Sequence, residues 1–337
     1  VAGEVTTGPD GVRSAREYTY GPTGTLSSRI DRTADDTGKL RATRTDYDYD
    51  ALDRLVRSSV RTGDAPGGPV VMRTEYEPTV AGDLASETVT RKPDSADAVS
   101  TTRRFEYSEV GELTAIVTDG VRRSQRFDAD GGVVAAAGGS SYEYDAVGRQ
   151  IAQVTSDGAR IDTTYWADGS RREAATSSGS TRFYWDGDRL LNDVHATAEG
   201  ATGTASYLIG STRHARSIRP GGGAPSTSYY GTDRHGNVTD LMDEAGTVTT
   251  EYAYTDYGVP TVTGDRSTPL PGGVGELGYN PFQYAGEYTW RDSTQSLGPR
   301  TYDALQARFL SEDEAPLANR YAFVGLNPIM GVDPSGR

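Results

Sequence analysis

The chain has no cysteine, and this absence excludes several kinds of site at once. Disulfide bonds, thiol nucleophiles and zinc sites with cysteine ligands all need that sulfur atom. Histidine is nearly as scarce, because the 337 residues include only His195, His214 and His235. None of the three has a partner at metal-ligand spacing, so structural roles are favoured over catalytic ones. We therefore predict neither a metal ion nor any other cofactor.

Positive charge is also in short supply, since 34 Lys and Arg stand against 48 Asp and Glu and the net charge is −14. Nucleic acids and anionic membrane surfaces are bound by basic faces, so neither partner is expected. No apolar run reaches the length of a membrane span. Residues 1–11 have neither the basic start nor the apolar core of a signal peptide. We expect a piece of a longer polypeptide at both ends.

Glycine and tyrosine are abundant, with 41 Gly and 21 Tyr against 6 Phe. Tyr favours half-buried strands, and Gly and Asp favour turns. Many of the tyrosines recur in one unit, in which alternating aromatics precede a turn of the Asp-x-x-Gly type and an apolar residue begins the return strand. Copies begin at Tyr18, Tyr47, Tyr76, Phe105, Phe127, Tyr142, Tyr165, Phe183, Tyr229 and Tyr252. Each copy is predicted to be a β-hairpin that stacks on its neighbours, because one short repeat cannot bury its own face.

No window of the sequence has a sustained helical period, so helices should be few and short. The chain is therefore predicted to be all-β. The pattern changes after a Pro- and Gly-rich stretch, and this change predicts three parts. Residues 1–262 form a β-sheet wall, residues 263–275 a linker, and residues 276–337 a segment that closes the wall.

The hairpin units resemble YD repeats, which occur in Rhs proteins, in the B and C components of Tc toxins and in teneurins. Tyr49–Leu55 and Tyr144–Arg149 have the tyrosine–aspartate form of that repeat with its closing arginine. Three ordered strings, Asn280–Tyr288, Arg300–Asp313 and Asn319–Gly336, resemble the Rhs repeat-associated core domain. The departures are modest: Ala307 stands where a glycine is usual, and Leu326 where an asparagine is usual.

The resemblance implies long antiparallel β-hairpin repeats in a spiralling sheet that is part of a hollow YD-repeat shell, with short helical turns near the C-terminus. It implies a structural encapsulation module of a polymorphic toxin, secreted or at the cell surface, and not an enzyme. The implied partners are a C-terminal toxin domain beyond residue 337, N-terminal YD repeats of the same polypeptide, and an immunity protein for the toxin. The toxin would be released by autoproteolysis after the Asp-Pro-Ser-Gly region.

Asp333 is the candidate catalytic residue. Taken alone, Asp333–Gly336 is a complete β-turn sequence, since Asp accepts backbone bonds, Pro fixes φ and Gly ends the turn. The resemblance implies a second role, because this Asp matches one acid of the family's self-cleaving pair. Two carboxylates that share a proton can divide the tasks of base and acid. The family's second Asp lies downstream of the motif, so this piece carries at most half of the site and is expected to be inactive alone.

Other candidate sites favour plain explanations. Glu312 and Asp313 are a possible substitute carboxylate pair, but a solvated acidic turn is the favoured interpretation. Asp128–Gly131 resembles the start of a calcium loop but lacks its distal Glu. No P-loop, G-x-S-x-G or dinucleotide fingerprint is found. Two alternative functions stay open: an extracellular carbohydrate- or receptor-binding module that uses the tyrosines, although packing is favoured, and an autoproteolytic aspartyl-type domain in its own right.

Overall fold

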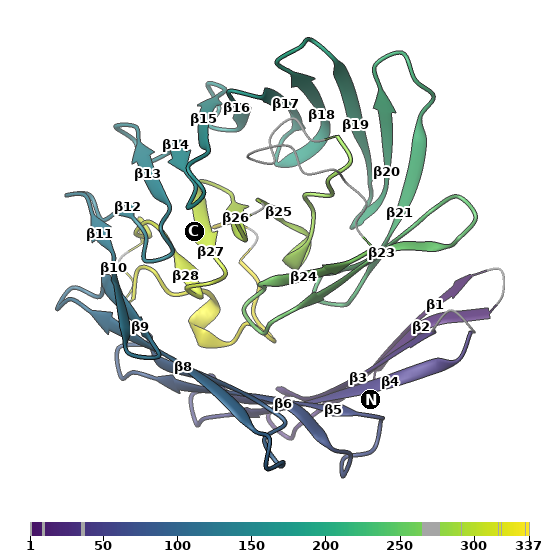
Figure 1. The fold of residues 1–337 in the computed structure, drawn as a ribbon, viewed down its shortest axis with the longest axis vertical. Coiled ribbons are helices and arrows are strands. Elements are labelled where there is room, and N and C mark those ends of the chain that lie inside the picture. The colour runs from purple at the N-terminus through teal and green to yellow at the C-terminus, as the bar shows by residue number, and fades with distance from the viewer. Residues whose placement is uncertain are drawn as a thin grey trace. The chain divides into compact units, whose positions relative to one another are not determined.

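The computed structural model describes residues 2–8, 11–34, 38–264, 277–290, 292–315, 317, 319–333 and 335–336. Nearly all of the regular structure in these residues is β-strand (Figure 1). The helical elements among them are two short 3-10 turns, η1 (Tyr284–Gly286) and η2 (Val324–Leu326). The prediction of an all-β chain with short helical turns near the C-terminus is therefore confirmed.

The described strands form three antiparallel sheets, each in sequence order. The first contains β1 (Ala2–Gly8), β2 (Gly11–Tyr20), β3 (Leu26–Ala34), β4 (Leu40–Tyr49), β5 (Leu55–Thr62), β6 (Val70–Pro78), β7 (Leu84–Arg91), β8 (Val99–Tyr107), β9 (Leu113–Thr118) and β10 (Val121–Ser124). Each strand between β1 and β10 pairs with the strands before and after it in the chain, so the sheet is a run of hairpins, as predicted.

The second sheet continues the same arrangement. It contains β11 (Arg126–Phe127), β12 (Val133–Ala135), β13 (Ser141–Tyr144), β14 (Gln150–Val154), β15 (Arg160–Tyr165), β16 (Arg171–Thr176), β17 (Gly179–Asp186), β18 (Arg189–Thr197), β19 (Thr202–Ile209), β20 (Arg213–Pro220), β21 (Ser226–Thr232), β22 (Val238–Met242), β23 (Val248–Tyr254) and β24 (Pro260–Thr263). The third sheet is small and lies in the C-terminal segment. It contains β25 (Tyr288–Thr289), β26 (Thr294–Leu297), β27 (Arg300–Asp303) and β28 (Arg308–Phe309).

The hairpin turn explains why Asp and Arg recur in the repeat. Asp145 Oδ1 accepts hydrogen bonds from the backbone N–H groups of Val147 (3.1 Å) and Arg149 (3.0 Å), and Nε of Arg149 donates to its Oδ2 (2.7 Å). Asp50 makes the same three bonds with Leu52 and Arg54. Burial works against ionisation of Asp145, but these bonds outweigh it and lower the pKa of Asp145. One carboxylate thus closes the turn and fixes the arginine at its end.

The two aromatics of a repeat have different tasks. The first is buried, as at Tyr47 and Tyr142, and supplies apolar contact. The second is only half-buried, and its hydroxyl donates to a backbone carbonyl of an earlier strand: Tyr49 bonds Leu26 (2.9 Å), and Tyr107 bonds Leu84 (2.7 Å). These tyrosines therefore join one hairpin to the preceding one, in agreement with the packing role favoured from the sequence.

The chain divides into two compact units. The first unit comprises residues 1–124, 233–235 and 316–332, and the second comprises residues 125–232, 236–315 and 333–337. The predicted division into residues 1–262, 263–275 and 276–337 stays a prediction, because residues 265–275 of the linker lie outside the described residues.

The core of the second unit joins its large sheet to the C-terminal segment. Phe282 and Tyr288 pack among buried residues of β15 to β23. The ring of Phe282 lies 4.9 Å from that of Tyr207, and the ring of Tyr288 lies 5.6 Å from that of Phe183, both edge-on. Such aromatic pairs contribute about 0.5–1.5 kcal/mol each beyond the area they bury. This packing holds the segment that carries the third sheet against the strands of its own unit.

Candidate functional site

Asp333 begins a turn, as its sequence context predicts. Its Oδ1 accepts hydrogen bonds from the backbone N–H of Gly336 (3.0 Å) and from the hydroxyl of Ser335 (3.2 Å). Gly336 has a positive φ of 61°, a conformation that glycine adopts without strain. One oxygen of the Asp333 carboxylate thus serves the turn.

The other oxygen faces a buried arginine. Oδ2 of Asp333 lies 3.6 Å from Nη2 of Arg300 in β27, and the same nitrogen lies 2.8 Å from Oδ2 of Asp313. Nε of Arg300 donates a 2.6 Å hydrogen bond to the carbonyl of Gly336. The guanidinium carbon lies 3.6 Å from the ring centroid of Phe309. We call Arg300, Asp313, Asp333 and Gly336 the C-terminal cluster.

The position of Asp313 shows that the sequence interpretation of this residue was wrong. Glu312–Glu314 was predicted to be a solvated acidic turn, yet Asp313 is only 3% exposed. It points inward because the Arg300 cation offers it a partner and because its Oδ1 accepts from the N–H of Ala315 (2.8 Å). Glu314 is exposed, as expected. Nothing in the acidic run itself marks its middle residue as buried, so no local sequence signal identified it.

The cluster places two carboxylates beside one guanidinium. Burial lowers the pKa of Arg300, and the charges of Asp313 and Asp333 oppose that effect. Arginine nevertheless keeps its proton in proteins, so Arg300 is a fixed cation. With both acids ionised, the three side chains carry one net negative charge. The Nη2 atom of Arg300 thus faces an oxygen of each carboxylate, at 2.8 Å for Asp313 and 3.6 Å for Asp333.

A third carboxyl group is electrostatically linked to Asp333. Burial raises the pKa of Glu287 to about 7, the charge of Arg213 opposes this, and the charges of Asp333 and Asp188 add to it. Glu287 immediately precedes β25, whose Tyr288 pairs with Ser296 of β26. A carboxyl group with a pKa near 7 can hold or release a proton at neutral pH.

The backbone at Ser335 and Gly336 lies directly against Leu297 and Gly298, where β26 ends and the turn to β27 begins. A Cβ atom on Gly336 would collide with the carbonyl oxygen of Leu297, and one on Gly298 would collide with that of Ser335. Both glycines have positive φ, 61° and 52°. The backbone therefore passes so close that only glycine fits at either place.

The histidines do not form a site with one another. Nε2 of His195 lies 2.8 Å from Asp193 Oδ1 and Nδ1 lies 3.2 Å from Thr181 Oγ1, while Tyr207 donates to Asp193 Oδ2 (2.8 Å). These four side chains are buried beside the core of the second unit, where their polar groups serve as hydrogen-bond partners for one another. His214 is exposed, and His235 is half-buried in the first unit. No group of three or more metal-type side chains gathers among the described residues.

The turn at Asp128 also has a plain explanation. Its Oδ1 accepts from the N–H groups of Asp130 (3.0 Å) and Gly132 (2.8 Å), which is the turn chemistry of the other repeats. The calcium-loop resemblance at this position therefore needs no ion to account for the conformation.

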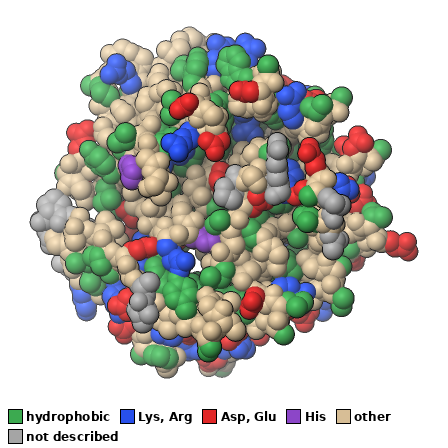
Figure 2. Space-filling model, turned by 180° about the vertical axis from the view of Figure 1, so that it is seen from behind, with side chains coloured by type: hydrophobic (Ala, Val, Ile, Leu, Met, Phe, Trp, Pro, Cys, Tyr) green, Lys and Arg blue, Asp and Glu red, His purple; other side chains and the backbone are tan. Residues whose placement is uncertain are grey.

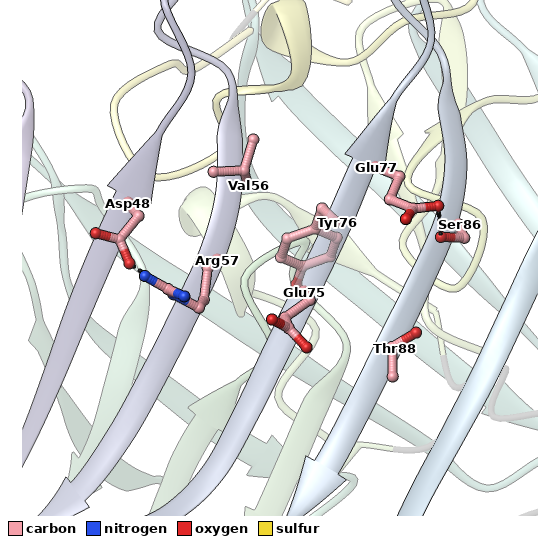
Figure 3. Close-up of a pocket in the computed structure, with 8 residues that line it drawn as sticks. All are labelled: Asp48, Val56, Arg57, Glu75, Tyr76, Glu77, Ser86 and Thr88. Carbon is pink, nitrogen blue, oxygen red and sulfur yellow. Dashed lines mark hydrogen bonds and ion pairs between the residues drawn. The ribbon is translucent and has the colours of Figure 1, made fainter. Parts of the chain in front are cut away.

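A pocket of about 420 Å³ lies on the first sheet across β4 to β7 (Figure 3). Its lining residues are Asp48, Val56, Arg57, Glu75, Tyr76, Glu77, Ser86 and Thr88. Asp48 pairs with Arg57 (2.7 Å), and Ser86 donates to Glu77 (2.6 Å). Both are contacts between adjacent strands. Pairing within the sheet therefore accounts for these polar side chains of the pocket.

The charged side chains on the face seen in Figure 2 are mixed, with Lys and Arg interspersed among Asp and Glu. Exposed pairs such as Arg160 with Glu143 (2.7 Å) are examples of this pattern within the second unit. None of the described helices has the length and apolar character that crossing a membrane requires.

The described fold is a series of stacked antiparallel hairpins with Asp-x-x-Gly turns, followed by a small C-terminal sheet, and it resembles a YD-repeat β-sheet. No family model matches the chain. The fold nonetheless matches the crystal structure of TcdB2-TccC3-Cdc42 with a TM-score of 0.56 at 16% identity, over 99% of this chain and 21% of that chain. It also matches the Photorhabdus luminescens Tc holotoxin pore with a TM-score of 0.55 at 16% identity, over 99% of this chain and 21% of that chain.

Two curated relatives are toxins or nucleases. The chain is 26% identical over 298 residues to the tRNA3(Ser)-specific nuclease WapA of Bacillus spizizenii, covering 86% of this chain and 12% of that protein. It is 26% identical over 358 residues to double-stranded DNA deaminase toxin A of Burkholderia cenocepacia, covering 99% of this chain and 22% of that protein. The chain thus spans about a fifth or less of these relatives. The resemblance to the Rhs/YD-repeat family predicted from the sequence is confirmed.

Proposed function

We propose that this chain is a non-catalytic encapsulation module of an Rhs/YD-repeat polymorphic toxin. It encloses a C-terminal toxin domain beyond residue 337, together with N-terminal YD repeats of the same polypeptide, and an immunity protein binds the toxin. Two findings support this: the fold match to TcdB2-TccC3 over 99% of the chain, and relatives named as toxins that are much longer than the chain. Residues 1–262 act as the wall and residues 276–337 as the closing core. The protein works outside the cytoplasm, secreted or at the cell surface.

We further propose that the toxin is released by self-cleavage downstream of Asp333. The observation that carries this is the C-terminal cluster, in which Asp333 lies 3.6 Å from a buried cation while the turn fixes its other oxygen. In the hydrolysis, one ionised carboxylate takes a proton from the attacking water as its oxygen bonds the scissile carbonyl carbon. The second acid, downstream of Gly336, gives its proton to the leaving amine nitrogen as the C–N bond breaks. Overall, one water molecule is consumed for each peptide bond that is cleaved.

The test of cleavage uses the complete reading frame of the gene, expressed as the wild type and as Asp333→Asn. We expect a C-terminal fragment from the wild type and an intact chain from the variant, measured by intact-protein mass spectrometry. Asp145→Asn is the matched control, because Asp145 has the same turn chemistry at a repeat far from the cluster in sequence. An uncleaved wild-type chain, or equal cleavage of Asp333→Asn, contradicts the proposal.

Encapsulation has its own measurement. After cleavage, the C-terminal fragment should co-purify with the module and resist added protease until denaturant opens the module. The free toxin domain, expressed separately, is the control for intrinsic resistance. A fragment that dissociates at once, or that is digested as fast as the free domain, would show that it is not enclosed.

A further inference from the structure

Among the described residues of the second unit, five glutamine side chains are buried, and one of them differs from the rest. Gln125, Gln153, Gln283 and Gln306 each make at least one hydrogen bond through the side-chain amide. Gln295 of β26 is 0% exposed, yet neither its Nε2 nor its Oε1 has a hydrogen-bond partner among the described residues. Because none of the side chain is exposed, no water molecule fits beside it. Burying an amide without hydrogen bonds is unfavourable, so the folded state bears this cost.

The neighbours of Gln295 in the third sheet direct their polar groups elsewhere. Gln295 lies between Thr289 of β25 and Tyr302 of β27. The Thr289 hydroxyl donates to the carbonyl of Glu287 (3.3 Å), and the Tyr302 hydroxyl donates to that of Tyr257 (2.8 Å). The unpaired amide is therefore enclosed at the centre of the sheet, and its cost is confined to this element.

Two turns of the same sheet add backbone strain. Ser293, between β25 and β26, has a φ of 69°, and Ala307, between β27 and β28, has a φ of 58°. Residues with a Cβ atom disfavour this left-handed conformation. The four strands are only two to four residues long, so few ladder bonds offset these costs. When the sheet opens, water can bond the Gln295 amide and both turns can relax, so each of these features favours the open form.

We propose that the third sheet is a metastable lid that opens locally while the rest of the second unit stays folded, and that Gln295 sets how often it opens. Proteins open locally with free energies from near zero up to that of global unfolding, and costs confined to one element lower its own opening free energy. The Gln153 side chain of β14 acts in the opposite sense, because its Nε2 donates to Asp292 in the connection from β25 to β26. That the lid covers a cargo rests on the proposed function, whereas the local opening does not.

The experiment measures hydrogen exchange of the complete polypeptide by mass spectrometry of its peptides. In the wild type, amides of β26 and β27 should exchange faster than those of β17 to β19, whose strands are eight or nine residues long. Gln295→Met keeps an unbranched side chain of similar length without the amide, so it should slow exchange in β26 and β27 about tenfold. Gln295→Leu is a second apolar variant, which carries the test if Gln295→Met does not fold.

Gln153→Met is the matched control, because it is the same substitution at a buried glutamine that has a partner. It should speed exchange in β26 and β27, whereas exchange in β17 to β19 should stay at the wild-type rate in both variants. Unchanged or faster exchange of β26 and β27 in Gln295→Met overturns the inference. Wild-type exchange in the third sheet that is no faster than in β17 to β19 overturns it as well.

The lid role is tested on the C-terminal fragment that remains with the module. If the third sheet covers this fragment, Gln295→Met should slow its digestion by added protease about tenfold, in step with hydrogen exchange. Equal digestion in the wild type and the variant, together with slower exchange, overturns the lid role. Digestion of the wild-type fragment as fast as that of the free toxin domain would instead overturn the proposed function, so the two failures are distinguishable.

Discussion

The buried carboxyl group of Asp303 and the half-buried one of Glu287 predict that the second unit becomes more stable as the pH falls from 7 to 5. Burial raises the pKa of Asp303 to about 6, with the charge of Asp292 adding to it and bonds from Leu305 and Gln306 opposing it. Burial also raises the pKa of Glu287 to about 7. In the unfolded chain these groups titrate near their ordinary values of 3.8 and 4.5. Between those limits the folded state binds more protons than the unfolded state, so stability rises as pH falls.

The magnitude follows from integrating this difference in bound protons. Between pH 7 and pH 5, Asp303 contributes about 1.4 kcal/mol and Glu287 about 2 kcal/mol, or about 3 kcal/mol together. Below about pH 4 the trend should reverse, because Asp145 of the second unit has a lowered pKa and the stability that its ionised form gives is lost there. Burial lowers the pKa of His235, and this effect destabilises the folded state as the pH falls. His235 lies in the first unit, so it does not alter the prediction for the second unit.

Tryptophan fluorescence reports on the second unit specifically, because Trp166, Trp185 and Trp290 all lie there. Denaturant titrations at pH 8, 7, 6 and 5 give the free energy of unfolding, and Asp303→Asn and Glu287→Gln should each remove their own part of the pH dependence. Asn at position 303 keeps an oxygen for the N–H groups of Leu305 and Gln306, so the variant tests charge and not shape. A wild-type free energy that is flat or falls from pH 7 to 5 refutes the reasoning.

Three further predictions concern packing and turns. Asp145→Ala should lower the free energy of unfolding by about 1–2 kcal/mol in urea titrations, because two backbone N–H groups lose their acceptor; a loss no larger than that of an exposed-site alanine variant would contradict this. Tyr302→Phe should cost about 1–2 kcal/mol, since its buried hydroxyl donates to the Tyr257 carbonyl (2.8 Å); unchanged stability refutes it. Gly336→Ala should displace the chain end and, on the proposed function, abolish cleavage, whereas Gly148→Ala, with open space at its Cβ, should cleave normally.

The hairpin repeats were predictable because their determinants are local. Alternating aromatics, an Asp that closes a turn and a Gly at positive φ all lie within a few residues, and Tyr142–Arg149 contains the whole set. The register shift just before the second tyrosine was not predicted. It occurs at Asp48/Tyr49 and at Glu143/Tyr144, where the partner strand contains one extra residue. A regular alternation of residue types contains no signal for such a bulge.

The contacts of the C-terminal segment could not be predicted from the sequence, because they join residues that are far apart along the chain. In the first unit, Asn319 donates to Asp83 Oδ1 (2.8 Å) and to the Gly82 carbonyl (3.0 Å), and Asn327 donates to the Asp53 carbonyl (2.7 Å). These bonds join residues more than 230 positions apart. Arg300 and Asp313 are closer in sequence, yet nothing in the sequence alone pairs one arginine with one of several acids.

The location of the C-terminal cluster has a consequence for the timing of cleavage, if the proposed function holds. Arg300 lies in β27, Asp313 follows β28, and Asp333 lies beyond both, so the three meet only after the third sheet has formed. That sheet in turn depends on the core of its unit, because the Tyr302 hydroxyl bonds the Tyr257 carbonyl and Tyr288 packs on Phe183. Asp333 therefore meets its cation only where the third sheet and that core are in place. A self-cleaving chain benefits from this order, since a site that assembled earlier would cut the cargo free before the wall had folded.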